Sequence, residues 1–202
     1  MPRLKFSNML GLKLETDPRW VNIVEKNIEE ILTDHAYCEQ KAATNAISIL
    51  ISYSYHPDLV DEMLSLAKEE LTHFEMVHQK IKDRGLKLGF ERKDQYVIDL
   101  YKFMRKGHIK EIALIDRLLF SAMVEARSCE RFRLLSQNIN DEDLRKFYHE
   151  LMISEANHYT TFLALAKKYG SATEDVNARW QQWLNHEAGI LKNYGKQETI
   201  HG

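Results

Sequence analysis

The sequence predicts an all-α protein built around four long helices, and three observations support this. Glycine and proline are scarce, with 8 Gly and 3 Pro among 202 residues, whereas a β-sandwich or barrel needs a turn signal about every 8–12 residues. Apolar residues recur at steps of three and four, which is the period of an amphipathic helix. The hydrophobic share of 44% and the charged share of 29% argue against a disordered chain and a membrane-spanning one.

The first helical stretch begins at Asp17 and Pro18, where a capping side chain precedes proline at the first helical position. The helical pattern continues to about Tyr55. Thr33 or Asp34 could cap a second helix within this stretch. The sequence therefore leaves open whether the stretch forms one long helix or two stacked helices.

Pro57 opens the next long helix, which is expected to run to about Arg84 and to end near Gly85. Residues 86–107 mix charged residues with two glycines. We expect one short helix in this segment, around residues 92–105.

The third long helix is expected from about His108 to Gln137, and Asn140 or Asp141 caps the fourth. The predicted architecture is an antiparallel four-helix bundle with a longer crossover between its second and third helices. The four helices cover roughly residues 34–55, 57–84, 108–137 and 141–169. The length suits one domain, residues 1–202.

The fourth helix is expected to run to Tyr169 and to stop at Gly170, which is predicted to adopt the left-handed conformation that ends many helices. A last helix is expected to begin at Thr173 and to end at Gly195. It carries an apolar cluster that we expect to pack on the bundle, formed by Trp180, Trp183 and Leu184.

Each of the four long helices carries an acidic residue on its apolar stripe. Glu39 interrupts the stripe of the first helix and Glu125 that of the third, while Glu155 and His158 lie one turn apart on the fourth. Residues on such a stripe point into a bundle core. Burying an ionised carboxylate there costs several kcal/mol unless something pairs with it, so these positions predict a site.

The second helix contains two Glu-x-x-His matches, Glu70/His73 and Glu75/His78. The stripe through the first match is apolar, whereas the stripe through the second contains two lysines. Spacing favours the same choice, because Glu39 precedes Glu70 by 31 residues and Glu125 precedes Glu155 by 30. We therefore predict that Glu70 and His73 belong to the site.

Four carboxylates and two imidazoles in one core carry an excess negative charge that two metal ions would neutralise. One Glu from each of two helices and Glu-x-x-His from each of the other two is the arrangement of carboxylate-bridged dimetal centres. Carboxylates with one imidazole per metal suit iron or manganese. The predicted metal ligands are Glu39, Glu70, His73, Glu125, Glu155 and His158.

Three further residues lie near the predicted site. Cys38 and Cys129 are too few for a disulfide framework and are expected to be small buried hydrophobic residues, although both could lie close to the metals. His35 precedes Glu39 by one turn and is either its hydrogen-bonding partner or a satisfied core histidine.

The N-terminal residues contain no extended apolar segment, and no 18-residue apolar run occurs, so we expect a cytoplasmic protein without a membrane partner.

Four stretches of the sequence resemble the MiaE-type tRNA hydroxylases, and the resemblance as a whole covers about residues 17–190. The stretch Glu125-Ala-Arg-Ser-Cys-Glu-Arg-Phe132 is more specific than the ligand set, which all ferritin-like dimetal proteins share. The other three stretches cover residues 34–43, 68–75 and 154–159.

The resemblance implies a ferritin-like four-helix bundle with additional N-terminal, crossover and C-terminal helical segments, which binds two iron ions. It also implies O2-dependent hydroxylation of the isopentenyl group of 2-methylthio-N6-isopentenyladenosine in tRNA, with electrons from an external partner. All six predicted ligands match the family pattern. The four glutamates are then also the catalytic residues, with Glu70 and Glu155 bridging the ions.

Two alternatives remain open at this point. The first is another ferritin-like di-iron activity, either iron oxidation and storage or peroxide removal. The second is a non-enzymatic helical protein whose acidic core residues pair with basic ones. Basic partners are available, since Arg127 and Arg131 lie close to the predicted site in the sequence.

Residues 80–110 contain ten basic and four acidic residues, a net charge of +6 that leaves −8 for the rest of the chain. Four aromatic residues lie among these charges: Phe90, Tyr96, Tyr101 and Phe103. Basic and aromatic side chains together suit stacking on the exposed bases of an RNA loop. With the resemblance, we expect this segment to face tRNA; without it, a solvated connector whose aromatic residues pack on the bundle is the simpler interpretation.

Overall fold

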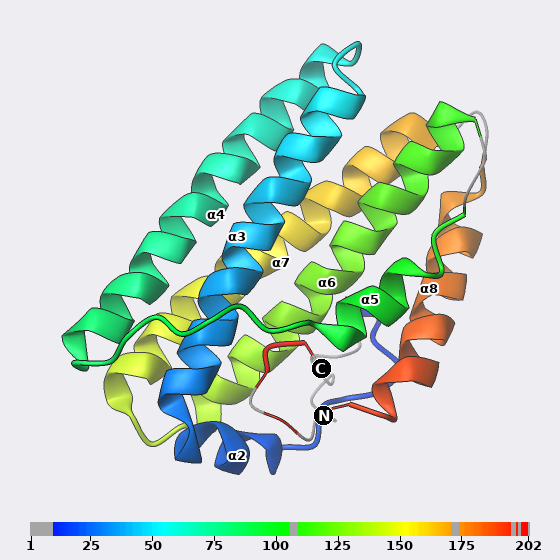
Figure 1. Ribbon diagram of the computed structural model, residues 1–202. Helices are drawn as coiled ribbons and strands as arrows, with labels where there is room; N and C mark the ends of the chain where they lie inside the picture. The colour runs from blue at the N-terminus through cyan, green and yellow to red at the C-terminus, as the bar shows by residue number, and fades with distance from the viewer. Residues whose placement is uncertain (1–9, 106–108, 171–173, 195–196, 198, 202) are drawn as a thin grey trace, which may run out of the picture. The chain divides into compact units, whose positions relative to one another are not determined.

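The computed structural model describes residues 10–105, 109–170, 174–194, 197 and 199–201. All regular secondary structure within these residues is helical, so the predicted all-α class is confirmed (Figure 1). The chain divides into two compact units, described separately below. One unit comprises residues 26–93 and 198–200, and the other comprises residues 1–25, 94–197 and 201–202.

In the unit of residues 26–93, helices α3 (Ile28–Ser52) and α4 (Pro57–Asp83) run side by side as an antiparallel pair (Figure 1). Proline at the first position begins α4, as predicted. Gly85, with φ of 67°, ends it, and the N–H groups of Gly85 and Leu86 return to the carbonyls of Lys82 and Ile81. The pair buries apolar residues of both helices, including Ile31, Leu32, Ala46, Ile49, Leu59, Met63 and Val77.

The predicted cap at Thr33 or Asp34 is wrong. The helical stretch does form two helices, but α2 (Trp20–Lys26) and α3 are separated at Asn27. Thr33 and Asp34 are buried within α3 and bind other parts of their unit. The hydroxyl of Thr33 accepts a hydrogen bond from Gly89 N at 3.2 Å, and the Asp34 carboxylate accepts one from Ile200 N at 2.7 Å.

In the other unit, α6 (Lys110–Asn138) and α7 (Glu142–Gly170) form a second antiparallel pair (Figure 1). The carboxylate of Asp141 accepts a hydrogen bond from Leu144 N at 3.0 Å, which confirms the predicted cap. The crossover helix α5 (Gln95–Tyr101) is shorter than expected and is capped by Asp94.

Helix α8 (Val176–Leu191) follows a cap at Asp175, while Thr173 and Gly195, its predicted ends, lie outside the described residues. The predicted packing of Trp180, Trp183 and Leu184 is confirmed, because all three are buried. The ring of Trp183 meets Phe103 edge-on, with 5.1 Å between the ring centroids. None of the described helices is long and apolar enough to cross a membrane.

The prediction of a left-handed Gly170 is wrong, although the helix does end there. Among the described residues, only Gly11 and Gly85 have positive φ. Gly170 is required for a different reason, since a Cβ atom at this position would lie 2.3 Å from Cγ2 of Val176 and 3.2 Å from Cδ1 of Ile115. Glycine therefore allows α7, α8 and α6 to approach closely at this point.

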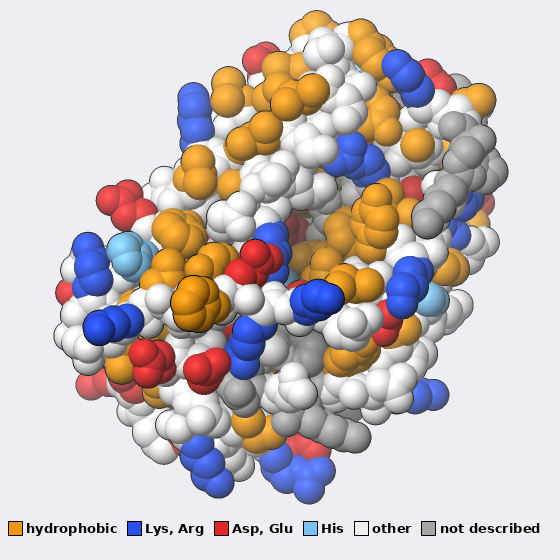
Figure 2. Space-filling model, in the orientation of Figure 1, with side chains coloured by type: hydrophobic (Ala, Val, Ile, Leu, Met, Phe, Trp, Pro, Cys, Tyr) orange, Lys and Arg blue, Asp and Glu red, His pale blue; other side chains and the backbone are white. Residues whose placement is uncertain are grey.

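The surface drawn in Figure 2 mixes basic and acidic side chains, with hydrophobic side chains exposed between them. No extended field of one sign covers the described residues on this face.

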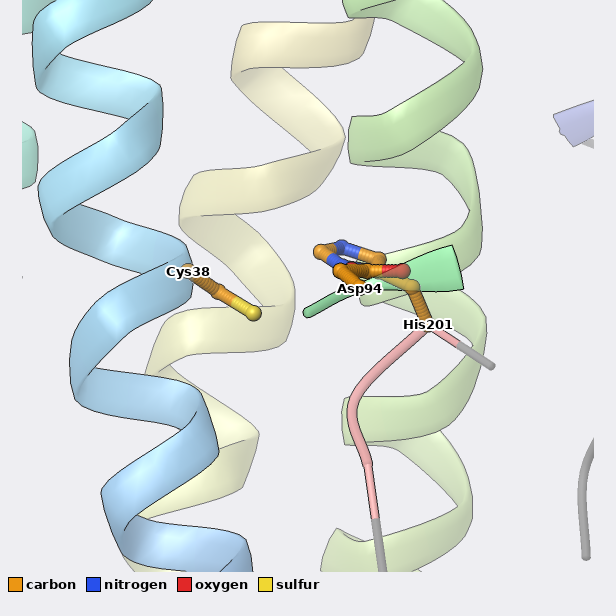
Figure 3. A group of neighbouring side chains, drawn as sticks. All are labelled: Cys38, Asp94 and His201. Atoms are coloured by element: carbon orange, nitrogen blue, oxygen red, sulfur yellow. The ribbon is translucent and has the colours of Figure 1, made fainter. Parts of the chain in front are cut away.

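His201 connects the C-terminal segment to α5 and α6. Its Nδ1 lies 2.9 Å from Oδ2 of Asp94, next to which it is drawn in Figure 3, and its Nε2 lies 2.9 Å from Oγ of Ser128. The imidazole also stacks on Tyr96, with the two planes 13° apart. Both His201 and Ser128 are buried, so these contacts belong to the interior of their unit.

Candidate metal centre

The α3–α4 pair carries the first predicted ligand set, which consists of Glu39 on α3 with Glu70 and His73 on α4. All three side chains are buried. Nδ1 of His73 lies 3.2 Å from Oε2 of Glu70 and 3.7 Å from Oε2 of Glu39. The competing residue Glu75 is exposed, so the helical register predicted from the sequence is the one that points inward.

His35 is the hydrogen-bonding partner of Glu39. Its Nε2 lies 2.6 Å from Oε1 of Glu39, and the ring is fully buried. This contact shows that His35 is a hydrogen-bonding partner of Glu39, which was one of the two interpretations left open by the sequence. Fixing a carboxylate in this way is a usual role for residues that surround metal ligands.

Electrostatic interactions within this set favour the charged forms of the Glu39 carboxylate and the His73 imidazole. Burial alone would raise the pKa of Glu39, but hydrogen bonds with His35 and His73 lower that pKa well below its usual range. Burial alone would lower the pKa of His73, but Glu39 and Glu70 raise it to about 10. A metal ion bound to His73 would compete with a proton for the imidazole.

The α6–α7 pair carries the second predicted set, with Glu125 on α6 and with Glu155 and His158 on α7. These side chains are buried as well. Nδ1 of His158 lies 3.9 Å from Oε2 of Glu125 and 3.9 Å from Oε1 of Glu155. Each helix pair thus brings together two carboxylates and one imidazole.

The chemistry of both sets fits a divalent metal ion. Ligand atoms bound about 2.1 Å from an ion are separated from one another by roughly 3–3.5 Å, close to the measured distances of 3.2–3.9 Å. Two carboxylates balance the charge of one divalent ion. Both sets belong to groups of buried residues that could hold a metal.

Neither of these two ligand sets contains a cysteine. Burial raises the pKa of the Cys129 thiol to about 12, and its Sγ donates to the carbonyl of Met152 at 3.3 Å. Cys129 is therefore the small buried residue that was expected, whereas Cys38 is only partly buried. Carboxylate and imidazole donors without thiolates favour iron or manganese over structural zinc.

A buried ionic network holds the Glu125-bearing helix in place. The Arg127 guanidinium donates to Glu187 of α8 at 2.6 Å and to Glu130 at 3.0 Å. Glu130 also accepts hydrogen bonds from the N–H and the hydroxyl of Thr16. Arg127 thus pairs with acidic residues of its own unit, as the sequence allowed, but its partner Glu187 was missed because it lies 60 residues away without any local signal.

A family model described as tRNA-(MS[2]IO[6]A)-hydroxylase (MiaE) matches residues 4–202. This chain belongs to the MiaE family. A Pseudomonas putida relative named tRNA 2-(methylsulfanyl)-N(6)-isopentenyladenosine(37) hydroxylase is 40% identical over 159 residues, which is 79% of this chain and 76% of the relative. A relative of the same name from Salmonella typhimurium is 30% identical over 223 residues, covering 87% of this chain and 81% of the relative.

The fold of this MiaE-family chain is similar to that of a solved structure, "Protein 43 with aldehyde deformylating oxygenase activity from Synechococcus". The TM-score is 0.85 at 31% sequence identity, and the match covers 95% of both chains. The ferritin-like fold class predicted from the sequence is confirmed, as is the resemblance to the MiaE-type hydroxylases.

Proposed function

We propose that this MiaE-family enzyme is an O2-dependent, non-haem di-iron monooxygenase that hydroxylates the isopentenyl group of 2-methylthio-N6-isopentenyladenosine in tRNA. The observation that carries the proposal is the presence of two buried sets of two carboxylates and one imidazole in a chain of a tRNA hydroxylase family. The names of the two bacterial relatives support the choice of substrate.

Each ligand set would hold one iron ion, and the four glutamates would also be the catalytic residues. When bound, the two iron ions would supply the redox chemistry that places one oxygen atom of O2 into a C–H bond and reduces the other to water. One ion would be bound by Glu39, Glu70 and His73, and the other by Glu125, Glu155 and His158.

The remaining contribution of the chain is orientation and exclusion of water. His35 fixes the orientation of Glu39 through the 2.6 Å hydrogen bond. Residues about one turn before and after the ligands are buried and mostly apolar, so they keep water from the reacting groups and suit a prenyl chain. These residues are Ala36, Ala43, Leu66, Val77, Ala122, Cys129, Leu151 and Phe162.

Further parts of the proposal concern the whole chain. Residues 1–202 would act as a single ferritin-like dimetal-carboxylate domain, which the 95% match to one solved chain supports. An external electron-transfer partner would supply the two electrons that each turnover consumes. A tRNA substrate would place the enzyme in the cytoplasm, and the basic segment 80–110 would face this tRNA.

The decisive experiment compares tRNA nucleosides by mass spectrometry from cells with and without the gene. We expect the hydroxylated prenyl-adenosine to disappear without the gene and the unhydroxylated nucleoside to accumulate. Normal levels of the hydroxylated nucleoside in the deletion strain would refute the substrate. A parallel assay with an aldehyde substrate tests the activity named for the similar solved structure.

Two measurements on the purified protein address the other ferritin-like activities. Anaerobic iron loading followed by metal analysis should give about two iron ions per chain, and fewer than one would refute the dimetal site. Light scattering should show a small particle, since iron-storage proteins assemble into large shells.

A further inference from the structure

We propose that Phe90 and the flanking lysines Lys87 and Lys93 form a contact surface for single-stranded RNA, in which Phe90 stacks on an exposed base and the lysines neutralise phosphates. This inference rests on the proposed function, because it takes tRNA as the substrate. It assigns the RNA contact to particular residues of the connector 86–93, which lies within the segment between α4 and α5.

The first observation is the position of the Phe90 side chain. It is 96% exposed, which is more than for any other large hydrophobic side chain among the residues that the structure describes. Burying a phenylalanine is worth about 1.5–3 kcal/mol, so a folded protein gains nothing by placing it in water. Because a single exposed apolar residue is common on protein surfaces, the surroundings of Phe90 decide whether its ring serves a ligand.

The second observation is that the backbone on both sides of Phe90 is fixed to α3. Gly89 donates its N–H to Thr33 at 3.2 Å and accepts a hydrogen bond from the hydroxyl of Tyr37 at 3.1 Å. On the other side, Nζ of Lys41 donates a hydrogen bond to the backbone carbonyl of Arg92 at 3.4 Å. The side chains of Glu91 and Arg92 add ion pairs with Lys41 at 3.1 Å and with Glu30 at 3.2 Å.

These anchors present the ring outward in a defined place. A ligand that stacks on Phe90 therefore does not have to order a loose loop first, which lowers the entropy cost of binding. An aromatic ring held in this way is the element that single-stranded nucleic-acid-binding proteins use to stack bases.

The third observation is the charge around the ring. Residues 80–93 contain six basic and two acidic residues, and one of the acidic residues, Glu91, is already paired with Lys41. Lys87 and Lys93 are exposed on either side of Phe90 in the sequence. A base-stacking ring between cations matches the backbone and the unstacked bases of an RNA loop.

The other aromatic residues of segment 80–110 do not share this character. Tyr96 is fully buried, Phe103 stacks on His186 with 4.2 Å between the ring centroids, and Tyr101 meets Phe120 edge-on. The guanidinium of Arg105 is bound by Asp116 and Glu174. The part of segment 80–110 that suits RNA is therefore its first half.

The test measures binding of the metal-loaded full chain to a synthetic anticodon stem–loop RNA by fluorescence anisotropy. We expect Phe90→Ala to weaken binding about 5- to 100-fold, whereas Phe90→Trp, which keeps an aromatic face, binds like the wild type. Ile51→Ala is the matched control, because Ile51 is another exposed hydrophobic residue, 68% exposed, on α3 of the same unit. Melting temperatures should be unchanged in all three variants.

The lysines are tested through the salt dependence of binding. Lys87→Glu and Lys93→Glu should each weaken binding and reduce the slope of log K against log salt by about one. Lys167→Glu, at an exposed lysine of α7, should leave the slope unchanged.

The outcomes separate this inference from the proposed function. If the wild type neither binds nor hydroxylates the RNA, the proposed function fails. If the wild type does both and Phe90→Ala behaves like Ile51→Ala, the function stands and the inference is overturned. A third outcome would assign the surface to a protein partner instead. In that case Phe90→Ala binds RNA normally, and its turnover is slower only when an electron-transfer protein, and not a chemical reductant, supplies the electrons.

Discussion

Glu70 and Glu75 lie on the same helix, and each is followed three residues later by histidine, yet only Glu70 and His73 are buried together. Burial separates a candidate ligand from a surface carboxylate of the same local sequence. It also provides a matched pair of substitutions for testing the predicted ligand set.

Glu70→Ala should reduce the metal content after anaerobic iron loading from about two ions per chain to one or fewer, and should lower turnover by ~100-fold or more, since even residues around metal ligands contribute about 10- to 100-fold. Glu75→Ala should retain both ions and most of the activity. Metal analysis and nucleoside assays on both variants provide the measurement. Equal losses in the two variants would show that the register is wrong.

His35 should contribute to metal affinity without being a ligand, because it orients Glu39 through a 2.6 Å hydrogen bond. We expect His35→Gln to weaken metal binding about 10- to 100-fold while the helical circular dichroism stays unchanged. His78→Gln on α4 is the control and should have little effect. Unchanged affinity in His35→Gln would leave His35 as a core residue only.

Among the helices, one connection outside the ligand sets is made by the buried carboxylate of Asp116 on α6. Its Oδ1 accepts one hydrogen bond from the guanidinium of Arg105 and one from the guanidinium of Arg179, each at 2.9 Å. Burial would raise the pKa of Asp116, but hydrogen bonds from Arg179 and Arg105 together lower that pKa below its usual range. The crossover segment and α8 are thus held to α6 by one buried carboxylate.

Asp116→Asn should lower the free energy of unfolding by about 3–5 kcal/mol at pH 7, because two guanidinium groups lose a buried partner. A lowered carboxyl pKa stabilises the fold above the unfolded pKa, and this stabilisation is lost as the pH falls through the folded value. The difference between wild type and variant should therefore be constant from pH 7 to about pH 5 and shrink below about pH 4. Urea unfolding across this pH range provides the measurement, and Asp61→Asn, at an exposed aspartate, is the control. If the difference in unfolding free energy between wild type and Asp116→Asn did not change with pH, the ionised Asp116 carboxylate would not have the stabilising role given to it.

Gly170 provides a test of helix packing. Gly170→Ala should lower stability by about 1–3 kcal/mol, since its Cβ would lie 2.3 Å from Val176. The double variant with Val176→Ala should recover much of the loss. Gly189→Ala in α8, where no atom lies within 4 Å of the added Cβ, should instead raise stability by about 0.5–1 kcal/mol. Thermal unfolding of these variants would contradict the packing argument if Gly170→Ala were neutral.

The helix pairs and the inward-facing acids could be predicted from the sequence because both follow from helical periodicity, a local property. The predictions that failed depend on tertiary contacts, which helical periodicity does not describe. Thr33 looks like a cap in isolation, but its hydroxyl binds Gly89. Gly170 looks like a left-handed terminus, but it is needed because Val176 and Ile115 lie so close. The pairing of Arg127 with Glu187 likewise has no local signature.

At the scale of the whole molecule, metal binding should raise the free energy of unfolding. At a metal concentration one hundred times the dissociation constant, each site adds about 2.7 kcal/mol, which corresponds to a rise in melting temperature of roughly 5–10 °C for a chain of this size. Anaerobic Fe2+ or Mn2+ should therefore raise the melting temperature of the metal-free protein by roughly 10–20 °C when both sites are filled. The double variant Glu39→Ala/Glu125→Ala should show none, and an equal rise in that variant would place the metal elsewhere.

Short connections also determine how such a chain folds. The α3–α4 pair is joined by residues 53–56 and the α6–α7 pair by residues 139–141, so each pair makes contacts between residues that are near one another in the sequence. Local contacts close quickly, whereas contacts between distant residues form slowly. The ligand sets therefore belong to the parts of the chain that we expect to form first, and the N-terminal segment, which reaches Glu130 from Thr16 across 114 residues, should join last.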